Sequence, residues 1–263
     1  MNVSIVGLLF VCAVAAAPAL ESTPKLESAE AQLAHADGVR SAMRGKEGDA
    51  KVAARKAAVE AYRAVREHWS SDAKACSEAA FHAGELLRSA NDAAAALAEF
   101  QVAHDRGKDS PWRVRAGLEI AHIHRRAQDG ERALAAYEAV LADAAASPGQ
   151  RDDASYWEGA VYASAKRIDD ARRVWQRVAD GGEDPLDRIR AWDAIAGSYV
   201  DAGDLEAAAG ALERCREATA EVAAEETRLG ERVRRALASM RAADELQRAV
   251  EKRDGKKSER KLP

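Results

Sequence analysis

Apolar residues between positions 80 and 216 recur by size, at a period far longer than that of a single helix or strand. In each copy a small residue is followed twelve positions later by an alanine, and a large apolar residue follows four positions after that alanine. A period of 37 or 38 residues indicates a structural repeat whose copies stack on one another. The small residues are Gly84, Ala121, Gly159 and Ala196, the alanines are Ala96, Ala133, Ala171 and Ala208, and the large residues are Phe100, Tyr137, Trp175 and Leu212.

A polar turn divides each copy into two helices. In the last copy, Gly203 permits a left-handed helix stop and Asp204 can cap the next helix. Prolines at 111, 148 and 185 recur every 37 residues, where they suit the first turn of a helix. The two small residues then let antiparallel helices approach closely, and the large residue fills the groove beside them. We therefore predict four helical hairpins within residues 50–216.

The flanks of the repeat region also favour helices. Ala58 and Tyr62 lie 38 residues before Ala96 and Phe100, which predicts a degenerate fifth copy whose first helix lies within residues 20–49. Residues 217–250 carry a narrow apolar stripe on a charged background and are expected to form one capping helix. Residues 251–263 are rich in lysine and arginine, and we expect a flexible tail there.

The start of the chain differs in character from the rest. The segment 3–17 has no charged residue, and the small-x-small pattern Ala17-Pro18-Ala19 follows it, so residues 1–19 are predicted to be a signal peptide cleaved before Leu20. Since no lysine or arginine precedes the apolar segment, an uncleaved N-terminal anchor stays an alternative. We expect an exported protein of the periplasm or extracellular space, in a bacterial envelope, with no integral membrane span after cleavage.

The fourth copy resembles a known family. Its residues Trp192-x-x-Ile195-Ala196-x-x-Tyr199, followed by Ala208 and Leu212, are similar to the tetratricopeptide repeat signature. The resemblance implies an all-α fold, a right-handed α-solenoid of tetratricopeptide-type antiparallel hairpins. The longer spacing resembles envelope proteins such as the periplasmic coordinator associated with the Tol-Pal system. The other copies depart from the signature at the tryptophan, where they have Ala80, Gly117 and Ser155.

Composition excludes several function classes. The chain has 263 residues, 47% hydrophobic and 32% charged, with a net charge of -4, so a folded protein is expected and a nucleic-acid partner is not. No nucleotide-binding, nucleophile-elbow or C-x-x-C motif is present, and we expect neither an enzyme nor a cofactor. His122 and His124 are two positions apart on one helix, so they face different ways and no metal site is predicted. Cys76 and Cys215 fall in distant repeats and are expected to stay separate buried thiols.

In the family that the repeats resemble, the first helix of each hairpin lines a concave groove where ligands bind. Carrying that register over implies a groove that is basic in its middle and holds an exposed tyrosine. Such a surface predicts a protein or peptide partner with an acidic segment or a C-terminal carboxylate. The alternative for these charges is an ordinary solvated face. The predicted groove residues are Arg88, Arg115, His122, Arg125, Arg126, Tyr156 and Arg190.

The sequence thus predicts a non-catalytic scaffold or adaptor of the cell envelope. The alternative is a structural component that associates with copies of itself, so a homo-oligomer stays open. Trp112 and Trp157 are further candidates for partner contact, whereas Trp175 and Trp192 fall on packing positions and are expected in the core.

Overall fold

The structure is a computed structural model that describes residues 23–108 and 110–259, with side chains described as far as residue 253. The predicted signal peptide, residues 1–19, lies outside this part of the chain. Helices connected by short turns make up the described residues, and no strand occurs among them. The helices are α1 (Ala29–Ser41), α2 (Gly48–His68), α3 (Ala73–Ser89), α4 (Ala93–Arg106), α5 (Pro111–Arg126), α6 (Gly130–Ala142), α7 (Pro148–Ser164), α8 (Ile168–Gly181), α9 (Pro185–Ala202), α10 (Leu205–Ala224), α11 (Arg228–Ala238) and α12 (Arg241–Glu259).

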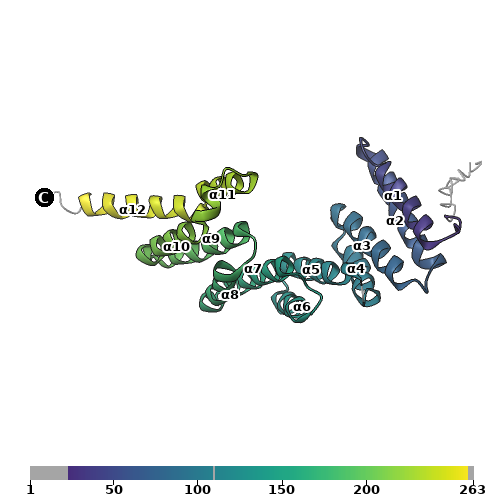
Figure 1. The fold of residues 1–263 in the computed structure, drawn as a ribbon, viewed down its shortest axis with the longest axis horizontal. Coiled ribbons are helices and arrows are strands. Elements are labelled where there is room, and N and C mark those ends of the chain that lie inside the picture. Colours follow the sequence, from purple (N-terminus) through teal and green to yellow (C-terminus); the bar gives the residue numbers. More distant parts are fainter. Residues whose placement is uncertain (1–22, 109, 260–263) are drawn as a thin grey trace, which may run out of the picture.

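Consecutive helices pack as antiparallel hairpins in an elongated array (Figure 1). Each hairpin packs on its neighbours, so four overlapping groups of buried side chains follow one another along the array. The all-α fold of stacked hairpins is as the sequence predicts. Stability in such an array is close to a sum of hairpin and nearest-neighbour terms.

The size pattern reflects direct contact between the two helices of a hairpin. A Cβ atom added at Gly84 on α3 would lie 2.7 Å from the Phe100 ring on α4, which is closer than Cβ atoms approach other carbon atoms in proteins. At Gly159 on α7 the added atom would overlap the indole of Trp175 on α8. The missing side chain allows the Trp175 Nε1–H to donate a 2.9 Å hydrogen bond to the Tyr156 carbonyl. The predicted pairing of a small with a large residue is confirmed at these hairpins.

The turns inside four hairpins share one backbone conformation. Asn91, Gln128, Lys166 and Gly203 have φ values of 63°, 60°, 63° and 77°, in the left-handed region. The residue after each one donates its N–H to a carbonyl five positions back, as in Asp204 to Tyr199 at 2.9 Å, which ends the first helix. In three of the four turns that next residue is an aspartate that caps the second helix, and Arg167 stands in its place in the turn after α7.

The N-terminal flank follows the expected degenerate copy. Ser28 caps α1 by accepting from the Ala31 N–H, and the turn between α1 and α2 has positive φ values at Gly45 and Gly48. Ala58 and Tyr62 on α2 are fully buried, as their repeat positions predict.

The C-terminal flank differs from the prediction of one capping helix at 217–250. Helix α10 continues to Ala224, and Thr227 then caps a new helix by accepting from the Gly230 N–H. A second break at Ser239 and Met240 lets α12 fold back against α9 and α10 (Figure 1). The break permits Val233, Met240 and Ala242 to be buried beside α9 and α10, which a straight helix would not allow.

The first part of the expected tail at 251–263 is helical. Helix α12 continues through residues 251–259. None of the helices in the part of the chain that the structure describes is both long enough and apolar enough to cross a bilayer.

Candidate partner-binding groove

A groove of about 360 Å³ runs across the first helices α3, α5 and α7. We call it the first-helix groove. Half of its residues come from α5, in the middle of the repeat array. Its lining residues are Phe81, His82, Glu85, Trp112, Arg115, Leu118, Glu119, His122, Gln150 and Asp153.

Aromatic rings form one wall of the first-helix groove. The ring centroids of Phe81 and Trp112 are 4.9 Å apart, and those of His82 and Trp112 are 4.8 Å apart. The Arg115 guanidinium lies over the rings of Phe81 and Trp112, 5.0 Å from the centroid of the Trp112 indole. Arg115 is exposed and forms no ion pair with any residue that the structure describes. Its N–H donors are therefore held over an aromatic surface and face solvent.

Several other charged residues on the first helices are paired between successive hairpins. Arg40 on α1 lies 3.3 Å from Glu85 on α3, and Arg88 on α3 lies 3.4 Å from Glu119 on α5. Asp153 on α7 is shared by His122 on α5 and Arg190 on α9. We call these contacts the first-helix ion pairs. The groove is thus of mixed charge. Of the predicted arginines, Arg88 and Arg190 are paired with acidic side chains, whereas Arg115, Arg125 and Arg126 form no ion pair with the described residues.

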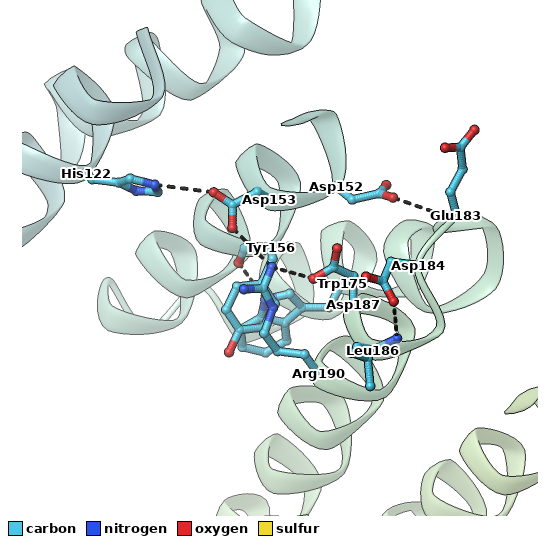
Figure 2. A network of polar contacts seen from close by, with 10 residues as sticks. All are labelled: His122, Asp152, Asp153, Tyr156, Trp175, Glu183, Asp184, Leu186, Asp187 and Arg190. Carbon is cyan, nitrogen blue, oxygen red and sulfur yellow. Dashed lines mark hydrogen bonds and ion pairs between the residues drawn. The ribbon is translucent and has the colours of Figure 1, made fainter. Parts of the chain in front are cut away.

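Asp153 lies within a network of polar contacts and contacts both His122 and Arg190 (Figure 2). Its two carboxylate oxygens lie 3.3 Å from His122 Nε2 and 3.2 Å from Arg190 Nη2. Burial alone would raise the pKa of Asp153, but the hydrogen bonds and charges of His122 and Arg190 lower it overall. Arg190 also contacts Asp187 at 3.2 Å, so Asp153 links α5, α7 and α9.

His122 is held on both sides of its ring. Besides Asp153, it contacts the Tyr137 hydroxyl on α6, with 2.7 Å between Nδ1 and the oxygen. Burial raises the pKa of Tyr137 to about 12, so the hydroxyl stays protonated and can donate to the ring. The part of the chain covered by the structure contains no group of three or more His, Cys, Asp or Glu side chains placed to hold a metal ion.

The seven predicted groove residues do not form one surface. Arg115 and His122 line the first-helix groove, while Arg88 and Arg126 line a separate recess at the turn ends of α3 and α5. Arg125 lies against Trp157, with its guanidinium carbon 3.8 Å from the ring centroid.

The other two, Tyr156 and Arg190, lie further along the array. Tyr156 lines a recess of about 730 Å³ between α7, α8, α9 and the start of α12. It is half-buried rather than exposed, because Arg190 lies 4.0 Å over its ring and Trp175 packs beside it (Figure 2). Burial raises the pKa of the Tyr156 hydroxyl accordingly.

Sequence reasoning missed the ion pairs between repeats, although one signal was present. Asp153 and Arg190 have opposite charges and are separated by 37 residues, which is one repeat. Side chains one repeat apart on stacked first helices are neighbours in space, so this spacing indicates an ion pair rather than two free charges. Both tryptophans expected in the core, Trp175 and Trp192, are buried there, and Cys76 and Cys215 are separate buried thiols.

No family model matches the chain, and no curated protein matches it. Among solved structures, a crystal structure of MamA superposes with a TM-score of 0.56 at 17% identity, covering 76% of this chain and 96% of that one. MamA 41-end from Desulfovibrio magneticus RS-1 superposes with a TM-score of 0.54 at 19% identity, covering 73% of this chain and 95% of that one. BtubC (BKLC) from P. vanneervenii superposes with a TM-score of 0.50 at 16% identity, covering 76% of this chain and 94% of that one. These tetratricopeptide proteins share the fold of this chain, which is therefore a tetratricopeptide-like array of helical hairpins.

Proposed function

We propose that the protein is a non-catalytic scaffold that binds an acidic segment of a partner protein in the first-helix groove. The observation that carries this proposal is Arg115, an exposed guanidinium without an ion-pair partner in the described chain, stacked on Trp112 at the groove wall. A planar guanidinium fixed over an aromatic ring is well suited to pair with a carboxylate, because the ring orients its N–H donors and limits the entropy lost on binding.

The surrounding residues favour a peptide over a small anion. Phe81, Trp112 and Leu118 supply apolar contact area beside the single free charge. The groove spans three helices, so it can hold several residues of an extended or helical segment. Glu85, Glu119 and Asp153 would repel a strongly acidic run, so the segment is expected to place one carboxylate at Arg115 and apolar residues elsewhere.

Site-specific photocrosslinking tests this proposal. A photoreactive residue at Leu118 is expected to capture a protein partner in cells, and the Arg115→Glu exchange is expected to reduce that adduct at least fivefold. Arg173→Glu on α8 is the matched control, since Arg173 is equally a surface arginine and pairs only with Asp170. Equal adduct yields for the protein with the Leu118 probe alone, with added Arg115→Glu and with added Arg173→Glu would show that Arg115 does not recruit the partner.

We also propose that the protein acts after export, on the basis of the uncharged segment 3–17 and the small-x-small pattern that ends at Ala19. N-terminal sequencing of the native protein from cell fractions is expected to begin at Leu20. A native chain that begins at Met1 in the cytoplasmic fraction would contradict the proposed export.

A further inference from the structure

A second pocket lies on the opposite side of α5 from the first-helix groove. Its volume is about 140 Å³, and it opens between the second helices α4 and α6. Gly117 of α5 forms part of the floor, and apolar side chains of α5 and α6 surround it. We call it the Gly117 pocket, and its lining residues are Gln101, His104, Arg113, Val114, Gly117, Ile120, Ala136, Ala139, Val140 and Asp143.

The repeat explains why this pocket exists. Gly117 occupies the position of Trp192, which lies 75 residues later, two repeats along the chain. In the α9–α10 hairpin the indole of Trp192 is packed into the core and is only 2% exposed. In the α5–α6 hairpin no side chain leaves position 117, and the pocket lies beside that position. The nearest atom to an added Cβ is Val140 Cγ2, at 3.1 Å.

The size and lining of the pocket define the group that fits it. A cavity of about 150 Å³ with apolar walls binds a single aromatic ring. Val114, Ile120 and Val140 supply such walls, and the Arg113–Asp143 ion pair, 2.7 Å long, lies at the polar rim. Buried pockets of this kind in interfaces typically hold one aromatic side chain of the partner.

Arg113 adds a polar feature beside the ring site. Its Nε–H is enclosed and has no acceptor among the described residues. At the equivalent position in the α9–α10 hairpin, Arg188 donates its Nε–H to the Ala179 carbonyl at 3.3 Å. The corresponding donor of Arg113 is thus left unpaired beside the pocket in the described chain.

We infer that the Gly117 pocket is a second docking site, which holds one aromatic side chain of a partner protein in the place that Trp192 fills in its own hairpin. The inference rests on the proposed scaffold function, but it concerns a different surface. Residues 115 and 118 face the first-helix groove and residues 114 and 117 face the pocket, so the two sites can be altered separately.

The probe for this site is 5-fluoroindole, followed by ¹⁹F NMR in the presence of the purified full chain. Wild-type protein is expected to bind it with a dissociation constant on the order of 1 mM. Gly117→Trp is expected to weaken binding at least tenfold, because the new indole fills the pocket from within. Ala139→Trp, at an exposed position on the rim, provides a second blocking variant that leaves the core unchanged.

Gly149→Ala is the matched control, since a Cβ at Gly149 meets no atom within 4 Å. Circular dichroism at 222 nm confirms that each variant is folded. Absence of binding to the wild type, or equal binding to wild type and both blocking variants, would overturn the inference. Arg115→Glu is expected to leave the binding of 5-fluoroindole unchanged, so failure of the groove proposal and failure of this one give different results.

Discussion

Single residues in this protein set how closely two helices can approach. Gly159 and Trp175 illustrate the point, because the indole lies where a Cβ atom of residue 159 would be. The same contact brings Trp175 Nε1 within 2.9 Å of the Tyr156 carbonyl. A methyl group at position 159 would therefore disturb both packing and a buried hydrogen bond.

We predict that Gly159→Ala destabilises the protein by about 1–3 kcal/mol, the usual range for forced overpacking. Gly149→Ala lies on the same helix and meets no neighbouring atom, so its effect is expected to stay within about 0.5 kcal/mol. Urea unfolding followed by circular dichroism measures both. Similar midpoints for the two variants would show that the indole of Trp175 can move aside at little cost.

The turn residue Lys166 is a second case in which one residue affects stability, here through backbone strain. It adopts φ = 63°, where a side chain is strained, and Gly203 holds the same position in the last hairpin. We predict that Lys166→Gly raises the free energy of unfolding by about 0.5–1 kcal/mol. Lys166→Ala retains the strain and is expected to give no gain. Thermal melts of the two variants would separate strain from the loss of the lysine side chain.

At the scale of helices, polar contacts between hairpins supplement the apolar core. Asp153 joins three first helices through His122 and Arg190, and these partners hold its pKa below the usual range. A carboxylate with a lowered folded pKa stabilises the fold above its unfolded pKa, and that stabilisation is lost as the pH falls through the folded pKa.

We predict that Asp153→Asn is less stable than wild type by about 1 kcal/mol at pH 7, because both partners are only partly buried. The difference should shrink between about pH 5 and pH 2 as Asp153 is protonated in the wild type. Asp169→Asn, whose side chain is 94% exposed, is the control and should match wild type across this range. A difference that persists at low pH would assign the effect to lost packing instead.

The hairpins could be predicted from the sequence because the size pattern records a contact within one repeat. Gly84 and Phe100 are only 16 positions apart, and their packing does not depend on how repeats are arranged. Contacts between repeats depend on the rotation from one hairpin to the next, which a size pattern does not encode. The pairing of Arg88 with Glu119, which are 31 positions apart, and the half-buried state of Tyr156 could therefore not be predicted, whereas the one-repeat spacing of Asp153 and Arg190 did indicate their pairing.

The C-terminal helices show a different limit. Most residues on either side of Glu225–Thr227 favour helix, so composition gives little sign of a break. The break is favoured by what it buries, since Val233 and Met240 reach the core only after the chain has turned. Tertiary packing thus overrides local propensity at this point.

On the scale of the whole molecule, α11 and α12 close the end of the array. They cover α9 and α10 with Val233, Met240 and Ala242, each no more than 6% exposed. We predict that a chain ending at Ala224 unfolds at a lower temperature and binds a dye for exposed apolar surface, because solenoid ends need a cap. A chain ending at residue 253 keeps these contacts and is the control. Equal melting temperatures for the two would show that the cap contributes nothing to stability.

The first-helix ion pairs have a consequence for the shape of the molecule. They lie along one side of the array and are all partly exposed, whereas among the described second helices only α2 and α4 share such a contact, between Glu99 and the guanidinium groups of Arg63 and Arg66. At 1 M salt the Debye length is about 3 Å, so the attraction within partly exposed ion pairs is weakened. The side of the array that carries the first-helix ion pairs is therefore weakened more than the other side. We therefore predict that the radius of gyration from small-angle X-ray scattering increases between 0.05 and 1 M salt, and that Asp153→Asn reduces this increase. Ionic strength would then set the curvature of the surface that a partner meets.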